Sequence, residues 1–456
     1  MLNETVMPIE EINMTIMDNI CEFVARTEFQ DIPDETVSYT QTMTSKIVAA
    51  MLVGVKTVAG QRAVVYGEGN GKSNEVGAIG TQKRFSLEDA AFVNGITCHA
   101  AELEDDQFPS ATSDITIFPV VFPLAEKLKA SGKSLLTASA VGIEVMHRIG
   151  MFPLSSKGIT DLPFYGVIGA AVTAAKMLNL STEQIKSAIG ISLGRASGFI
   201  TNFGTDAHYI ESAAACRDGL MAARLAKLGM TGTADLEGWL SSVCKGTNFD
   251  LNKVVEGLGE PTWRVHQTWI KKYPCCFLTH RHIDMMLDIL AEKSIKGEEI
   301  RNIDIHVGPV DYTCNRPCPV DTEDARFSFQ HILGAIMVDG DIDSHHFTKE
   351  GLANERIKNA RKKVNVIRHD DWPSEFMSGL ALLEITLQDG TVISKEKEQA
   401  RGGPKEPLSD AEVETLYRKY TRPVLAEDQI NKTWEMISRL DKTEDLSEMI
   451  NLLINP

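Results

Sequence analysis

An acidic segment with one histidine offers the most specific chemistry in the chain. His99 is followed by Glu102, Glu104, Asp105 and Asp106, so that four acids stand within five residues. At helical spacing His99, Glu102 and Asp106 would share one face, and the end of a helix disfavours negative charge. Such a cluster needs a cation, a shared proton or solvent. It is either a solvated acidic helix end or the source of a general base or a proton-bearing carboxyl group.

A basic turn lies in the second half of the chain, around Pro274. Its cationic side chains are Lys271, Lys272, His280 and Arg281. A helix is expected to follow the turn, and cations and a helix N-terminus both favour carboxylates. The turn therefore fits a pocket for an anion, and it fits a solvated basic turn equally well.

A glycine-rich stretch, residues 67–73, has only part of a phosphate-binding pattern. The P-loop pattern requires a glycine at position 66, which is occupied by Tyr66, so we expect an ordinary loop. The sequence has no dinucleotide fingerprint and no metal-ligand spacing. We therefore expect no metal, flavin, nicotinamide or iron–sulfur cofactor.

The elements that must position these residues are mostly helical. From about residue 10 to residue 260 the chain shows alanine-rich apolar periodicity. Ser86 opens a helix predicted over residues 87–106, and Ser181 opens another in the same way. Residues 166–178 are rich in small side chains, which predicts closely packed helices in a buried core.

The pattern changes over residues 270–400. Alternating segments at 303–307 and 382–387 predict strands, and the second is closed by Asp389-Gly390 before a further strand. Two helical stretches lie between them, and the tail after Ser409 returns to helix. A helical domain interrupted by an α+β insertion explains this order.

The composition limits the class of protein. With 456 residues and 43% hydrophobic residues the chain can bury large cores, and its formal charge of −17 argues against a nucleic-acid partner. We expect no membrane span and no secretory signal. Eight scattered cysteines fit reduced thiols, so we expect a cytoplasmic protein.

Three blocks of the chain, at residues 91–106, 142–150 and 271–280, resemble signature regions of the MmgE/PrpD family. Similar stretches follow one another in the right order along nearly the whole chain, at residues 166–180, 188–198, 315–319, 325–329 and 387–390. The resemblance implies an enzyme that acts on a small polycarboxylate without a redox cofactor.

The resemblance also implies an architecture. We expect a mostly α fold with a large all-helical domain formed by both chain ends, residues 1–265 and 402–456, and a smaller α+β lid domain, residues 266–401. A pocket between the two domains and a homodimer are expected as well.

Site residues are carried over one by one. By resemblance, Glu102 stands where relatives have an active-site aspartate, and Lys271 matches a pocket lysine. Thr112 and Cys276 occupy positions where the decarboxylase of the family has histidines. His208 is kept, although the lysine three positions before it is lost. These departures argue against decarboxylation of cis-aconitate.

The family's reactions can all be drawn as proton movement beside a carboxylate, which needs a base and cations for the developing charge. We expect Lys271 to act as the base or charge stabiliser, with its pKa lowered if it is buried near Lys272. Glu102 or Asp106 would be the second proton carrier. The residues expected to bind or orient the substrate are His208, Tyr165, Lys272, His280, Arg281, Thr112 and Cys276.

Three hypotheses about function stay open. The first is a lyase, most simply one that eliminates water. The second is a two-base epimerase or isomerase of a dicarboxylate such as iminodisuccinate. The third is an inactive relative that binds a carboxylate, which the retention of both charged segments disfavours.

Overall fold

Helices dominate the computed structural model of the protein, which describes residues 14–107, 112–152, 154–246, 249–373 and 379–456. The expected fold class, mostly helical with a small sheet, is confirmed. The start of the predicted helical region lies among residues 1–13, outside the described part. No disulfide bond joins the cysteines in the described part of the chain.

Ten α-helices and four very short strands precede residue 271 in the described part. The helices are α1 (Ile16–Arg26), α2 (Asp34–Gly54), α3 (Val58–Gly69), α4 (Leu87–His99), α5 (Asp114–Leu128), α6 (Gly132–Ile149), α7 (Asp161–Met177), α8 (Thr182–Leu193), α9 (Asp206–Lys227) and α10 (Leu236–Val243). The strands are β1 (Val76–Gly77), β2 (Arg84–Phe85), β3 (Asp105–Asp106) and β4 (Trp269–Ile270).

The small side chains of α7 let its neighbours approach closely, as the sequence predicts. Helix α7 packs against α5, α6, α8 and α9. A Cβ atom built on Gly219 of α9 would lie 2.6 Å from the carbonyl oxygen of Val167 in α7, and one on Gly142 of α6 would lie 1.9 Å from Oγ1 of Thr173. A larger residue at either position would clash with α7, so these glycines allow α9 and α6 to lie close against α7.

The second part of the chain contains the sheet and the remaining helices. Its helices are α11 (His280–Lys293), α12 (Thr322–Arg326), α13 (Phe329–Asp339), α14 (Lys349–Ala353), α15 (Glu355–Arg361), α16 (Asp410–Thr421), α17 (Glu427–Ile437) and α18 (Ser447–Ile454). Its strands are β5 (Ile300–Val307), β6 (Val364–Arg368), β7 (Ala381–Leu387) and β8 (Val392–Glu396).

The four-stranded sheet has the order β6-β5-β7-β8. Strands β7 and β8 are antiparallel, with Ile385 opposite Ile393, so the predicted Asp-Gly hairpin is confirmed. Strand β5 pairs antiparallel with β7 and parallel with β6. Burial alternates along β5 and β7, which leaves one face of the sheet for the core.

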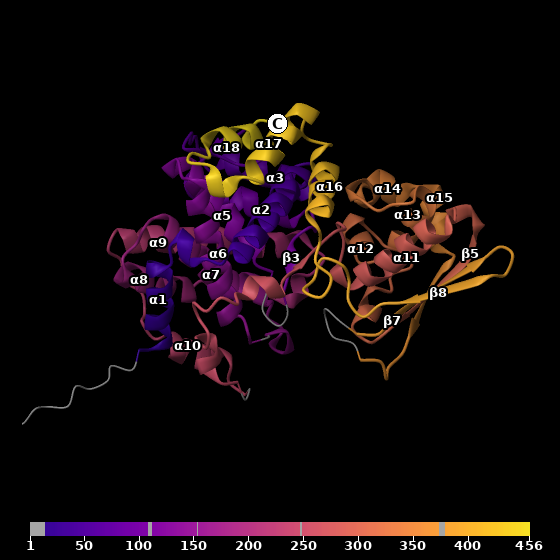
Figure 1. The fold of residues 1–456 in the computed structure, drawn as a ribbon, viewed down its shortest axis with the longest axis horizontal. Coiled ribbons are helices and arrows are strands. Elements are labelled where there is room, and N and C mark those ends of the chain that lie inside the picture. The colour runs from indigo at the N-terminus through magenta and orange to yellow at the C-terminus, as the bar shows by residue number, and fades with distance from the viewer. Residues whose placement is uncertain (1–13, 108–111, 153, 247–248, 374–378) are drawn as a thin grey trace, which may run out of the picture.

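Two hydrophobic cores organise the molecule. The larger is built from residues between Ile16 and Val265 together with residues between Tyr417 and Ile454. The smaller is built from residues between Tyr273 and Ile385. Figure 1 shows the yellow C-terminal helices α16–α18 on the indigo and magenta helical body, with the orange sheet and its helices beside it. The domain boundaries at 265/266 and 401/402 stay predictions.

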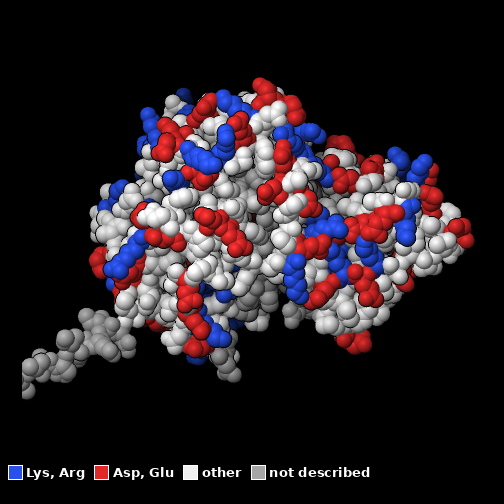
Figure 2. All heavy atoms as spheres, in the orientation of Figure 1, with Lys and Arg blue, Asp and Glu red and all other residues white. Residues whose placement is uncertain are grey.

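The surface carries charges of both signs. On the face drawn in Figure 2, Lys and Arg side chains are interspersed with Asp and Glu side chains. No single helix in the described part is long and apolar enough to cross a membrane; α2 and α3 pass a test of length and composition only as a pair bent by 83°.

Candidate active site

Helix α4 ends at His99, earlier than the sequence predicts. Its N-terminus is as expected, because the Ser86 side chain accepts a hydrogen bond from the Asp89 backbone N–H. At the other end Glu102 has a φ of 54°, in the left-handed region that turns the chain out of the helix. The expectation that His99, Glu102 and Asp106 share one helical face is therefore wrong.

The acidic segment instead forms a short strand against the basic turn. In the antiparallel pair β3–β4, Asp105 lies opposite Ile270 and Asp106 opposite Trp269. Lys271 directly follows β4, so this pairing carries its side chain to the acids that precede β3. The two charged segments singled out in the sequence thus meet in space, although 169 positions separate Glu102 from Lys271.

Lys271 binds two carboxylates in a buried cluster. Its Nζ donates to Glu102 Oε2 at 3.2 Å and to Glu104 Oε1. All three side chains are buried. Glu104 was absent from the predicted site. The signal that could have found it is its spacing, because residues 102 and 104 fall on the same side of an extended segment.

The two carboxyl groups differ in acidity. Burial raises the pKa of Glu102 to about 7, an effect that the neighbouring Glu104 increases and that Lys271 only partly offsets. Burial would also raise the pKa of Glu104, but attraction to Lys271 and His99 and the hydrogen bond from Lys271 hold it at about 2. One glutamate is therefore a fixed carboxylate, and the other gains or loses a proton near neutral pH.

Lys271 remains a cation. Burial would lower the pKa of its ammonium group, but the charges of Glu104 and Glu102 raise it well above its ordinary value. The expectation of a lowered pKa is wrong, because Lys271 meets acids where the sequence suggested only Lys272. As an ammonium group it stabilises negative charge and cannot accept a proton.

Asp106 is a second carboxyl group with a neutral-range pKa. Burial raises the pKa of Asp106 to about 7, with Lys271 opposing and Glu104 and Asp161 adding to the rise. Asp161, in the first turn of α7, was not predicted; burial raises its pKa to about 7 as well. Three carboxyl groups in this region can therefore carry protons at physiological pH.

Two histidines border the cluster. His99 is buried, its Nδ1 lies 2.8 Å from Ser212 Oγ, and burial lowers its pKa well below the ordinary value. Its ring stands edge-on to that of His208, with centroids 4.6 Å apart. His208 Nδ1 lies 3.6 Å from Glu211 Oε2. The structure thus places His208 beside the cluster through His99.

The polar groups of several other predicted residues are engaged elsewhere. The Tyr165 hydroxyl donates to the Phe152 carbonyl at 2.9 Å in the large core. Arg281 forms a two-pronged ion pair with Asp311, at 2.6 and 2.7 Å. Lys272 Nζ lies 3.4 Å from Asp284 Oδ1.

The remaining predicted residues are buried near the turn or near the acidic segment. His280 Nε2 lies 3.2 Å from the Cys275 carbonyl oxygen, and burial lowers the pKa of His280 to about 3, so its ring is neutral. Cys276 is buried, with its side chain against that of Cys314. Thr112 is buried and directly precedes Ser113, the N-cap residue of α5.

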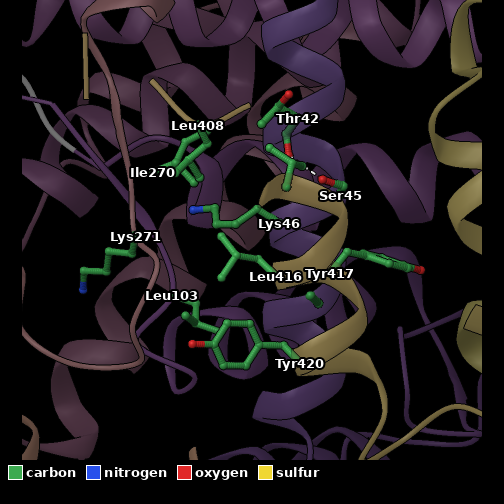
Figure 3. A pocket seen from close by; sticks show the side chains of 12 residues that line it. Thr42, Ser45, Lys46, Leu103, Ile270, Lys271, Leu408, Leu416, Tyr417 and Tyr420 are labelled. Atoms are coloured by element: carbon green, nitrogen blue, oxygen red, sulfur yellow. Dashed lines mark hydrogen bonds between the residues drawn. The ribbon is translucent and has the colours of Figure 1, made fainter. Parts of the chain in front are cut away.

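A small cavity lies on the other side of the segment that carries Lys271. Leu103, Ile270 and Lys271 line it together with residues of α2 and α16, and its volume is about 10 Å³. Figure 3 shows the Lys271 amine pointing away from this cavity. Small-molecule pockets have volumes of roughly 300–1,000 Å³, so this cavity is too small to hold a substrate.

Among the residues that the structure describes, two groups of side chains bring metal-ligand types close together. One is His99, Glu102 and Glu104, whose donor atoms lie within 4.8 Å of one another. Lys271 already binds both of these carboxylates, so a divalent cation would have to displace it. The other consists of Asp339, the last residue of α13, with His345 and His346 from the turn that follows.

Two family models match successive parts of the chain. Residues 18–252 match the model of the MmgE/PrpD N-terminal domain, and residues 273–442 match that of the C-terminal domain. Cis-aconitate decarboxylase of Homo sapiens is 28% identical over 388 residues, covering 80% of this chain and 79% of that protein. Cis-aconitate decarboxylase of Aspergillus terreus is 23% identical over 475 residues, covering 97% and 96%.

Proposed function

The chain belongs to the MmgE/PrpD family, and from that premise we propose that it is a lyase which acts on a small polycarboxylate by moving a proton at a carbon beside a carboxylate. The relatives in the comparison are named cis-aconitate decarboxylases, which are lyases. The observation that carries the proposal is the buried triad of Lys271, Glu102 and Glu104, in which one ammonium group binds two carboxyl groups of unlike acidity.

Each member of the triad has a role that follows from its charge. Removing a proton beside a carboxylate develops negative charge on that carboxylate, and a fixed cation in a dry site stabilises it. Lys271 supplies that cation. Glu102 carries the proton, because a group whose pKa lies near the working pH transfers protons most effectively in both directions. Glu104 keeps Lys271 charged and oriented.

Within this class we favour elimination of water over decarboxylation. Thr112 and Cys276 stand where the resemblance places decarboxylase histidines, and the lysine that should precede His208 is lost. Elimination from a β-hydroxy acid needs a base for the C–H bond and an acid for the departing hydroxyl group. Glu102 and Asp106, both with pKa values of about 7, supply two such groups.

The same pair of carboxyl groups favours a second candidate function. A two-base epimerase removes a proton from one face of a carbon and returns it to the other, so it needs two groups that exchange protons near neutral pH. Glu102 and Asp106 meet that requirement. A dicarboxylate such as iminodisuccinate would be its substrate.

Proton NMR of the purified protein in deuterated water tests these proposals. Methylcitrate, citrate, cis-aconitate and iminodisuccinate are incubated separately. A new alkene from a hydroxylated acid is the expected result, and loss of carbon dioxide from cis-aconitate would make the lyase a decarboxylase. Deuterium in an otherwise unchanged acid would establish the epimerase. Binding of these acids without any exchange would overturn the enzyme proposal in favour of a carboxylate-binding relative.

A further inference from the structure

Arg326 of α12 is a buried arginine that the proposed reaction does not yet use. Its guanidinium group donates to three backbone carbonyl oxygens: Pro274 at 2.7 Å, Ala101 at 3.2 Å and Ala100 at 3.4 Å. Ala100 and Ala101 directly precede Glu102, and Pro274 lies three residues after Lys271. One side chain from the smaller core's part of the chain therefore joins the two segments that carry the proposed triad.

These carbonyl groups need such a partner. Ala100 and Ala101 follow the last turn of α4. Carbonyl groups at this end of a helix receive no hydrogen bond from a backbone N–H of the helix, and they carry partial negative charge. The next residue, Glu102, has its backbone in the left-handed region, which a residue with a Cβ atom holds only when its surroundings fix it. The planar guanidinium group of an arginine presents five N–H donors in fixed directions, whereas the three donors of a lysine radiate from a single nitrogen atom.

Glu323, one turn earlier in α12, extends the same contact. Its Oε2 accepts a hydrogen bond from the Tyr209 hydroxyl and lies 3.5 Å from Arg326 Nε. The Tyr209 ring in turn stands edge-on to that of His99, with centroids 5.0 Å apart. Helix α12 thus borders the triad on the side of α4 and α9.

We infer that Arg326 is a positioning residue, which holds the left-handed turn at Glu102 against the Lys271 segment, and that the opposite charges of Arg326 and Glu323 adjust the charge environment that Glu104 and Lys271 create around Glu102. This inference rests on the proposed function, in which Glu102 is the proton carrier. It assigns to α12 a role in the reaction.

The charges around Glu102 give the inference a direction that can be measured. The groups that face Glu102 are Glu104, Lys271, Arg326, Glu323, His99 and Tyr209. Burial and Glu104 have the largest effects and raise the pKa of Glu102, and Lys271 lowers it. Next in size, Arg326 lowers this pKa and Glu323 raises it. Loss of Arg326 and loss of Glu323 must therefore move this pKa in opposite directions.

The first experiment measures kcat and kcat/KM against pH for the wild type and for Glu323→Gln, Arg326→Gln and Arg326→Lys. For Arg326→Gln we expect the limb that reports Glu102 to move up by about one pH unit and kcat to fall at least tenfold. For Glu323→Gln the limb moves down. For Arg326→Lys the limb stays near its wild-type position while kcat still falls, because the charge is kept and the three-carbonyl bridge is lost.

Arg316→Gln is the matched control. Arg316 pairs with Asp324 of the same helix at 2.6 Å, but its side chain is 36% exposed, so its loss should leave the profile unchanged. Identical profiles in the wild type, Glu323→Gln and Arg326→Gln would overturn the inference. Because Glu323 is partly exposed, its variant tests the charge effect even if removal of the buried Arg326 prevents folding.

A second readout separates this inference from the proposed function. The infrared band of the protonated Glu102 carboxyl group, identified by its loss in Glu102→Gln, can be titrated without substrate. Opposite shifts of its midpoint in the two α12 variants would support the inference even if every polycarboxylate proved inert. Unmoved midpoints alongside normal turnover would reject the inference and leave the proposed function standing.

Discussion

At the scale of single residues, the central feature is that one lysine serves two buried glutamates. If both were ionised, the triad of Lys271, Glu102 and Glu104 would carry a net negative charge in a site with little water. Burying an uncompensated charge is expensive, and a proton on one glutamate removes it. The glutamate in the less favourable contact, Glu102, takes that proton, and this makes it suited to proton transfer.

Replacement of Glu102 by glutamine should abolish most of the activity. Glutamine keeps the shape and can hydrogen bond to Lys271, but it cannot exchange a proton, so kcat should fall by about 10²- to 10⁴-fold. Steady-state kinetics on the substrate found by NMR measures this. Glu126→Gln is the control, because Glu126 binds Arg84 and the Gly77 N–H instead; it should retain wild-type kcat. A Glu102→Gln enzyme of normal activity would remove Glu102 from the mechanism.

Replacement of Asp106 by asparagine should alter how stability depends on pH. The pKa of Asp106 is about 7 in the folded protein, above its ordinary value of 3.8. The proton it holds therefore stabilises the fold fully below about pH 4, and this contribution is lost as the pH rises through 7. Between pH 5 and pH 8 the wild type should lose roughly 1–3 kcal/mol more unfolding free energy than Asp106→Asn.

Urea unfolding at pH 5 and pH 8 measures this difference. Asp206→Asn is the control, because the Asp206 side chain is 52% exposed in its pair with Arg62 and should leave the wild-type slope intact. Equal losses of stability in Asp106→Asn and in the wild type would show that Asp106 is already ionised in the folded protein over this range.

At the scale of elements, the end of α4 and the pair β3–β4 build the site. The helix stops at His99, the chain turns through Glu102, and two residues of strand then bind the segment before Lys271. A longer helix would have carried Glu102 and Asp106 away from Lys271. The end of α4 at His99 is therefore required to bring these carboxyl groups to Lys271.

Close packing of α7 against α9 is the second requirement at this scale, since α7 begins at Asp161 and α9 carries His208. Gly219→Ala should destabilise the protein by about 1–3 kcal/mol, because its Cβ atom would meet the Val167 carbonyl at 2.6 Å and the Ala170 Cβ at 2.5 Å. Chemical denaturation measures the loss. In Gly69→Ala, at the exposed end of α3, the Cβ atom meets nothing within 4 Å, so that variant should match or slightly exceed wild-type stability. Equal stability of both variants would contradict tight α7–α9 packing.

At the scale of the whole molecule, helix α16 ties the two cores together. Lys419 Nζ contacts Asp341 Oδ2 at 2.6 Å, and the Tyr420 hydroxyl donates to the Lys272 carbonyl at 2.7 Å. Lys272 lies beside Lys271, so a C-terminal helix of the large core braces the segment that carries the active-site cation.

The net charge of −17 should oppose the approach of a polycarboxylate. Raising the salt concentration from about 0.01 M to 0.15 M shortens the screening length from ~30 Å to ~8 Å. We expect kcat/KM to rise about twofold or more over this range, while kcat stays constant. Potassium and tetramethylammonium chlorides should give the same result. A fall in kcat/KM would show that the cations of the site, and not the whole molecule, dominate the field met by the substrate.

The sequence by itself determined the elements and the segments that matter. Helix starts at Ser86, Ser181 and Ser409, the hairpin at Asp389-Gly390 and the small-residue face of α7 depend on contacts within a few residues or on a simple period, so local patterns reveal them. The same patterns marked Glu102 and Lys271 as residues with chemistry to do.

Only the tertiary structure decided how those residues are paired and charged. It made Glu104 a partner of Lys271, raised the pKa of that lysine where a fall was expected, and brought Arg326 to the carbonyl groups before Glu102. A pKa depends on burial and on charges a few ångströms away. Here those charges come from residues more than 160 positions apart, at distances that the folded chain alone sets.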